Sequence, residues 1–123
     1  MVGQRASGGI VLVTMLLLGG CERPSSDRAK LDAIKAEAFS LMTLYPVETT
    51  QSRREIPKDE WPSSIASLRP ESVTVHWWGV DITTRPYFDG GWGYEIPRHG
   101  QELPMPAECY SEPSQGVFWH GPC

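Results

Sequence analysis

Histidine is the residue type best suited to metal binding and to acid–base chemistry near neutral pH, and this chain has three, His76, His99 and His120. No two of them are separated by the three or four positions that place two ligands on one helical face. A metal site would require histidines from separate strands and a loop to meet in space. We therefore predict no metal and no cofactor, and keep a metal-binding or catalytic domain as a minor alternative.

Residues for nucleophilic or paired-carboxylate catalysis give little further support for an enzyme. None of the serines lies in the Gly-x-Ser-x-Gly turn that presents a hydrolase nucleophile. Asp81, Asp89 and Glu95 lie near one another in the predicted sheet and would be the carboxylates of a glycosidase-type pair. A small open sheet leaves little room for a cleft that excludes water. We predict no enzymatic activity and name no catalytic residue.

Aromatic side chains are better candidates for a binding surface. Trp78 is expected at a turn or on the outer face of the sheet, where a large apolar side chain is costly unless something covers it. Together with Tyr87 and Trp119 it would form an aromatic patch for a protein, peptidoglycan or glycan partner. The aromatic residues that we expect in the core are Trp77, Phe88, Trp92 and Tyr94.

The start of the chain has the three parts of a secretory signal. A polar stretch with Arg5 precedes an apolar run from residue 10 to 18, and two glycines precede Cys21. The run is too short to span a bilayer, which takes about 20 apolar residues.

The sequence Leu18-Gly19-Gly20-Cys21 resembles the lipobox of bacterial lipoproteins. The resemblance implies cleavage after residue 20 and acyl chains such as palmitate on Cys21, so that the bilayer is the first partner. Glu22 stands where Asp would favour retention in the inner membrane, and this favours the outer membrane. The alternative is an ordinary signal peptide with a cysteine beside its cleavage site by chance.

The two remaining cysteines, Cys109 and Cys123, would lie in a compartment that permits disulfides. We expect them to pair, because closing a loop of about 15 residues contributes roughly 3 kcal/mol in the chain-entropy model. Two free thiols or a metal-binding pair are the alternatives.

The predicted mature chain is acidic. Ten basic and fifteen acidic residues follow position 20, which gives a net charge of −5. This charge argues against a nucleic-acid partner, and there is no polybasic patch for anionic lipid.

Residues 21–26 are expected to form a lipidated polar tether, followed by an amphipathic helix that Ser25 or Ser26 caps. The helix should end at Tyr45, because Pro46 restricts the residue before it. Its apolar face, at spacings of three and four, consists of Leu31, Ile34, Ala38, Leu41 and Tyr45.

A second, short helix is expected between Pro62 and Pro70, with Trp61, Ile65 and Leu68 on one face. This segment resembles small uncharacterised bacterial proteins, a resemblance that implies no activity. The ten residues before it, 47–56, show no period and are predicted to be a loop.

Residues 72–98 alternate β-branched and aromatic residues between glycines, which predicts strands. A turn at positions 78 and 79 would place His76 opposite Asp81 on the outer face, a contact that favours the protonated imidazole. The pairs on the inner face would be Trp77 with Val80, Val75 with Ile82, and Val73 with Thr84.

A second turn at 89–91 would add a third strand, with Pro86 causing a bend or bulge in the second. Residues 97–114 contain four prolines and are expected to cross the surface, and residues 116–121 to return as a last strand. The pairs that this turn predicts are Phe88 with Trp92, Thr84 with Ile96, and Arg85 with Glu95.

These observations predict a single α+β domain over residues 27–123, with two helices packed on an antiparallel meander of three or four strands. We expect a lipoprotein that faces the periplasm or the cell surface and binds or scaffolds an envelope protein or the cell wall. The first alternative is a small periplasmic inhibitor or immunity-type protein, and the second is the metal-binding or catalytic domain.

Overall fold

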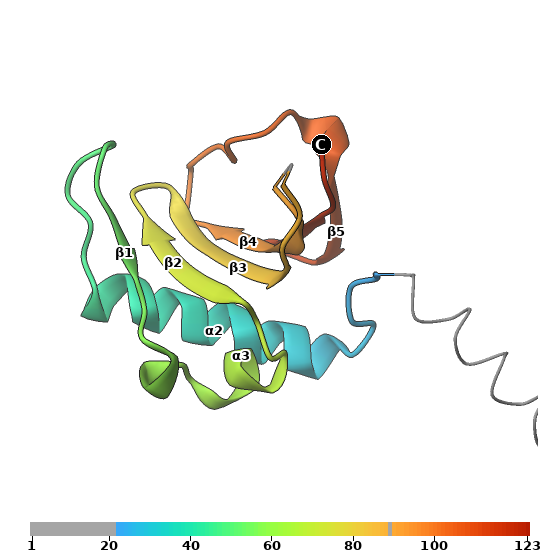
Figure 1. Cartoon of the computed structure of the whole chain (residues 1–123), viewed down its shortest axis with the longest axis horizontal. Helices are drawn as coiled ribbons and strands as arrows, with labels where there is room; N and C mark the ends of the chain where they lie inside the picture. The colour runs from blue at the N-terminus through green and yellow to red at the C-terminus, as the bar shows by residue number, and fades with distance from the viewer. Residues whose placement is uncertain (1–21, 89) are drawn as a thin grey trace, which may run out of the picture.

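The computed structural model describes residues 22–88 and 90–123 (Figure 1). The predicted signal segment, Cys21 and Asp89 lie outside the described residues. The fold is α+β, as predicted: helix α2 (Arg28–Leu44) and the short α3 (Ser63–Ser67) pack on a six-stranded antiparallel sheet. Within the described ranges, no helix is both long and apolar enough to cross a bilayer.

The sheet has more strands than the three or four predicted. Its order is β1-β2-β3-β4-β6-β5, so the last strand of the chain lies inside the sheet and β5 forms an edge. The strands are β1 (Arg53–Glu55), β2 (Ser72–His76), β3 (Gly79–Arg85), β4 (Trp92–Pro97), β5 (Tyr110–Ser114) and β6 (Val117–His120).

The two strands that the sequence pattern missed are both at edges. β1 is three residues long, and all three are exposed and charged, so it has no alternation of apolar and polar residues. β5 contains Pro113, which is tolerated at an edge because the missing N–H faces away from the ladder.

Helix α2 begins one residue later than a serine cap would place it. The Asp27 side chain accepts a hydrogen bond from the Lys30 backbone N–H at 3.1 Å, while the Ser25 hydroxyl accepts one from the Asp27 N–H at 3.0 Å. Asp27 is therefore the cap, which also places its charge at the positive end of the helix dipole. The buried face of α2 contains Leu31, Ile34, Ala38 and Leu41, as predicted, and Met42.

Helix α3 depends on α2 for its cap. No side chain of its own N-cap, Pro62, makes a capping bond. Instead, the Glu37 carboxylate accepts hydrogen bonds from the Ser64 and Ile65 N–H groups at 3.1 and 2.9 Å. A carboxylate from α2 thus satisfies the free donors of α3 and fixes the two helices together.

The register of the first hairpin differs from the prediction by two residues. Val75 pairs with Val80 and Val73 with Ile82, so the turn consists of Trp77 and Trp78. A shift of two residues leaves the side chains of the paired strands on their predicted faces, because side chains alternate with period two. All four of these residues are fully buried under α2.

The second hairpin differs more, because the connection from 86 to 91 is longer than a tight turn. Asp81 pairs with Glu95, Ile82 with Tyr94 and Val80 with Ile96. The register shifts between Thr83 and Arg85, directly before Pro86, where the sequence predicted a bend or bulge.

Residues 22–26 do not form a free tether. The Glu22 carboxylate makes an ion pair with Arg85 at 3.1 Å, and the Ser25 N–H donates to the Tyr94 hydroxyl at 2.7 Å. The segment that follows Cys21 is therefore attached to the end of β3 and to the core of the sheet.

Candidate functional site

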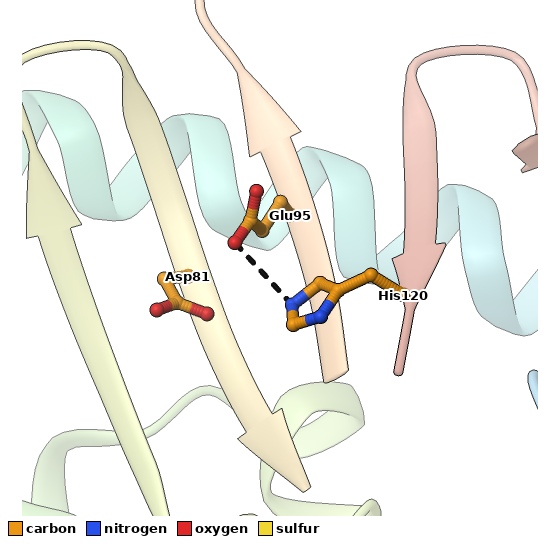
Figure 2. A group of neighbouring side chains, drawn as sticks. All are labelled: Asp81, Glu95 and His120. Carbon is orange, nitrogen blue, oxygen red and sulfur yellow. Dashed lines mark ion pairs between the residues drawn. The ribbon is translucent and has the colours of Figure 1, made fainter. Parts of the chain in front are cut away.

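Three titratable side chains meet on the face of the sheet that α2 does not cover. Asp81 of β3, Glu95 of β4 and His120 of β6 come from three adjacent strands and point toward one another (Figure 2). Asp81 and Glu95 are direct cross-strand partners, and His120 lies opposite Gly93, two positions along β4 from Glu95. We call Asp81, Glu95 and His120 the sheet cluster.

The pairing explains how His120 reaches the two carboxylates. Its cross-strand partner is Gly93, which has no side chain, and His120 therefore lies diagonally across from Glu95 on the same face. The backbone of Ile82 and Thr83 in β3 would meet a Cβ atom at position 93, so this close approach requires glycine.

Two members of the sheet cluster are buried to a degree that is rare for ionisable groups, and Asp81 is partly buried. Glu95 is 5 % exposed and His120 6 % exposed. Groups of this kind are costly to bury unless they are paired or bind a metal. One ion pair is present, between His120 Nε2 and Glu95 Oε2 at 3.3 Å.

The hydrogen bonds around the sheet cluster are incomplete. The Tyr110 hydroxyl donates to Glu95 Oε1 at 2.5 Å and accepts from the Met105 N–H at 3.3 Å. The His120 Nδ1 atom lies 3.1 Å from the Gly121 carbonyl oxygen. By contrast, within the described part of the chain, the buried atoms Asp81 Oδ1 and His120 Nε2 have no hydrogen-bond partner, and the contact of Nε2 with Glu95 Oε2 is an ion pair.

Burial and mutual charge shift the acidities of these groups. Burial, with the nearby Glu95 charge, raises the pKa of Asp81 to about 6. Burial alone would lower the pKa of His120, but Glu95, the Gly121 carbonyl and Asp81 together raise it. Burial and the bond to Glu95 raise the pKa of Tyr110. All three groups therefore hold their protons more strongly than in water.

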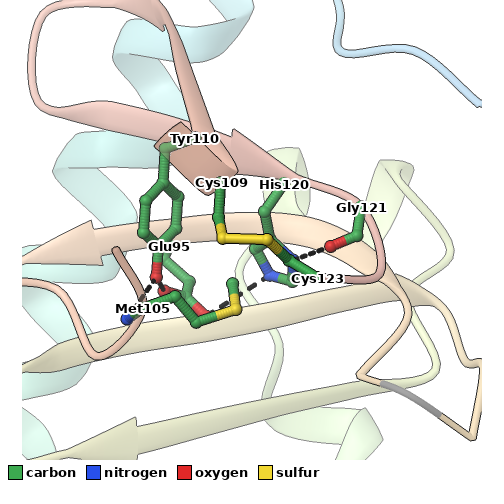
Figure 3. The surroundings of a disulfide bond; sticks show 7 residues. All are labelled: Glu95, Met105, Cys109, Tyr110, His120, Gly121 and Cys123. Atoms are coloured by element: carbon green, nitrogen blue, oxygen red, sulfur yellow. Dashed lines mark hydrogen bonds and ion pairs between the residues drawn. A yellow bond between two sulfur atoms is a disulfide. The ribbon is translucent and has the colours of Figure 1, made fainter. Parts of the chain in front are cut away.

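The disulfide lies next to the sheet cluster. Cys109 and Cys123 are joined, with their Cα atoms 6.0 Å apart, so the two segments that hold Tyr110 and His120 are bonded together (Figure 3). The chain between β4 and β5 passes over this face and brings Met105 beside Tyr110 and Glu95 (Figure 3). A pocket of about 530 Å³ lies beside this covering segment, and its lining includes Leu103, Met105, Tyr110 and Phe118.

The structure does not assemble the predicted aromatic patch. Trp78 is 7 % exposed and stacks on His76, and Trp119 is buried in the core under α2 against Tyr94. Tyr87 is exposed, but it follows β3 whereas Trp78 precedes it. The prediction of one surface formed by these three residues was wrong, because the register and the fold of the turn bury Trp78.

Two aromatic residues expected in the core are at the surface instead. Trp77 is 38 % exposed at the first turn, and Phe88 is 92 % exposed in the connection between β3 and β4. The connection does not pair, so nothing carries the Phe88 side chain to the inner face. Tyr94 is buried and Trp92 half-buried against the core, as expected.

The three histidines do not meet. His76 pairs with Gly79, and its place opposite Asp81 is taken by Thr74. Burial and the Arg53 charge lower the pKa of His76, which is the reverse of the predicted preference for the protonated form. His99 stacks on Phe39, away from the sheet cluster.

The sequence contained part of the signal for the sheet cluster. The carboxylates Asp81 and Glu95 were predicted to lie near one another, with Asp89 as a third that lies outside the described residues. The missing element was the position of β6, because nothing local in the chain indicates that it lies beside β4 and brings His120 to Glu95.

Comparison with known proteins gives no match to a family model, a curated protein or a solved structure. The function of this chain must therefore be inferred from its residues and their geometry.

Proposed function

We propose that this chain is a lipid-anchored protein of the bacterial envelope whose domain lies against the bilayer and binds a partner without catalysis. The lipobox-like Leu18-Gly19-Gly20-Cys21 supports the anchor, and Glu22 in place of Asp supports the outer membrane. The observation that carries the orientation of the domain is the ion pair of Glu22 with Arg85, which lies shortly before an exposed aromatic pair in the chain.

Glu22 connects the proposed anchor to one end of the sheet. It is bonded to Cys21 in the chain and is held by Arg85, the last residue of β3, at 3.1 Å. A lipid on Cys21 would therefore keep the β3 end of the sheet near the membrane surface, because no free linker lies between them.

The same end of the sheet presents Tyr87 and Phe88. Their rings stack at 5.0 Å, and their residues are 51 % and 92 % exposed. We call these two residues the aromatic tip. Aromatic rings are favoured at the membrane interface, and exposing an apolar ring such as Phe88 to water is otherwise unfavourable. With a net charge of −5 on the predicted mature chain, this contact would be apolar rather than electrostatic.

A binding role is favoured over catalysis by the state of the buried titratable groups. Glu95 is occupied by Tyr110 and His120, and both it and His120 are more than nine-tenths buried. Catalytic groups must reach a substrate, and these contacts instead fix strands and the covering segment together.

The anchor is tested by Cys21→Ala in cells. We expect the variant to stay unprocessed or to become soluble, since the acyl acceptor is lost. A mature, cleaved form that still fractionates with membranes would overturn the anchor.

The aromatic tip is tested by photo-crosslinking in the full chain. A benzoylphenylalanine at position 88 is expected to capture lipid, and the same group at Trp77 is expected not to, because Trp77 is exposed at the opposite end of β3. Mass spectrometry identifies the products. Equal lipid capture at both positions, or capture at neither, contradicts the proposed orientation while leaving the Cys21 result unaffected.

A further inference from the structure

We propose that the sheet cluster of Asp81, Glu95 and His120 binds one divalent transition-metal ion, with Zn²⁺ the best fit. One nitrogen or oxygen atom from each of the three residues lies within 4.8 Å of the others. The observation that points to a ligand is His120 Nε2, which belongs to a side chain 6 % exposed and faces both carboxylates (Figure 2). Among the described residues it has an ion-pair contact with Glu95 but no hydrogen-bond partner.

The backbone assigns the tautomer that a metal ligand needs. A carbonyl oxygen can only accept a hydrogen bond, so the 3.1 Å contact between Nδ1 and the Gly121 oxygen places a proton on Nδ1. In neutral His120 the lone pair is then on Nε2, directed into the cluster. Histidines that bind metals commonly donate their other ring N–H to a carbonyl or carboxylate in this way.

The two carboxylates are also prepared for a cation. Tyr110 donates to Glu95 Oε1, which orients the group and leaves Oε2 facing His120. Asp81 Oδ1 is buried without any donor, which is unfavourable for a carboxylate oxygen. A metal ion would satisfy this oxygen and His120 Nε2 at once.

The donor set indicates the class of ion. One imidazole and two carboxylates carry a charge that a divalent cation neutralises, and the nitrogen ligand favours zinc-like ions over Mg²⁺ or Ca²⁺, which prefer oxygen ligands alone. The two cysteines near the cluster are joined to each other, so thiolate ligands do not compete.

Such an ion would act on the fold. It would connect β3, β4 and β6 beneath the segment that carries Met105 and Tyr110, on the face of the sheet that α2 does not cover. The alternative occupant is a proton, in which case protonated His120 simply pairs with Glu95.

The test uses the full chain in detergent, carrying Cys21→Ser so that no thiol outside the disulfide can bind metal. After treatment with a chelator, Zn²⁺ is titrated against a chromophoric competitor. We expect one Zn²⁺ per chain and at least a tenfold loss of affinity in Asp81→Asn. His99→Asn is the matched control and is expected to bind as the parent does, because His99 lies away from the cluster.

Asp81→Asn is the decisive variant, because Asp81 Oδ1 makes no hydrogen bond with any described residue that the substitution would remove. Its thermal unfolding without metal checks that it folds. As a second readout, the Nε2 resonance of His120 in ¹⁵N NMR is expected to shift on adding Zn²⁺ while Nδ1 keeps its bound proton. Absence of stoichiometric Zn²⁺ binding, or equal affinity in Asp81→Asn and His99→Asn, would overturn the proposal and leave the proton as the occupant.

Discussion

The two faces of the sheet are stabilised in different ways. On one face, α2 covers a hydrophobic core in which Ile34, Ile82 and Ile96 are fully buried. On the other, a loop and a disulfide cover Glu95 and His120, which are almost equally buried but ionisable. The first face is stabilised mainly by the burial of apolar area. The second face depends on specific hydrogen bonds and ion pairs. Replacing one residue there is costly because its buried polar partner is left unpaired.

The largest expected effect is on the apolar face. Ile34→Ala should lower the free energy of unfolding by about 3–4 kcal/mol, because it opens a cavity in a packed core. Denaturant unfolding measures the change. Leu44→Ala is the control, since Leu44 is 70 % exposed on the same helix and its loss should cost less than about 0.5 kcal/mol. Similar losses for both variants would mean that α2 does not cover the core as described.

The disulfide should have the next largest effect and act on the second face. Replacing Cys109 and Cys123 together by serine should cost about 3 kcal/mol, because the unfolded chain regains the freedom of the loop. Denaturant unfolding again gives the value. In the parent protein, we expect neither thiol to react with a labelling reagent before reduction, and rapid labelling of both would contradict the bond.

Glu95→Gln should follow, measured without metal in the presence of a chelator. The substitution removes the charge that faces His120 and weakens the bond from Tyr110, so we expect a loss of about 2 kcal/mol. Glu102→Gln in the exposed part of the covering segment is the matched control. A change no larger than that of the control would mean that the second face does not depend on these pairs.

The smallest expected effect concerns His76, at the β2 side of the second face. Its pKa is lowered by burial and by Arg53, with Glu95 acting in the opposite direction, so the folded protein favours the neutral imidazole. The unfolded chain binds the proton more readily than the folded protein does. The free energy of unfolding therefore falls as the pH is lowered from about 7.5 to 5.5, through the ordinary histidine pKa of about 6.5.

The measurement for His76 is a difference. Over that pH range, the free energy of unfolding should fall less in His76→Gln than in the parent. Only the parent has an imidazole at position 76 whose pKa is lower in the folded state than in the unfolded state. Parallel pH profiles for the two proteins would show that His76 titrates alike in the folded and unfolded states.

The same contrast between the faces explains how far the sequence predicted the structure. Leu31, Ile34, Ala38 and Leu41 repeat with the helical period, so α2 and its buried face were predicted correctly. The alternation of Val73 and Val75 likewise predicted which face of β2 is buried. The register was not predicted, because a shift of two residues leaves the pattern unchanged.

Most of the candidate site could not be predicted from such local patterns. Asp81 and Glu95 were expected to be neighbours, but His120 joins them only because β6 is inserted between β4 and β5. The binding role expected of Trp78 failed for the related reason that the turn folds back and buries the ring against His76.

The sequence by itself determined the helical face of α2, the limits that Pro46, Pro62 and Pro70 set on the helices, and the α+β class, since these follow from local periodicity and local backbone restrictions. The tertiary structure alone decided the order of the strands, the exposure of Phe88, the ion pair of Glu22 with Arg85, and the meeting of Asp81, Glu95 and His120. The physical reason is that strand pairing joins residues far apart in the chain, and its free energy depends on the whole core that the pairing completes.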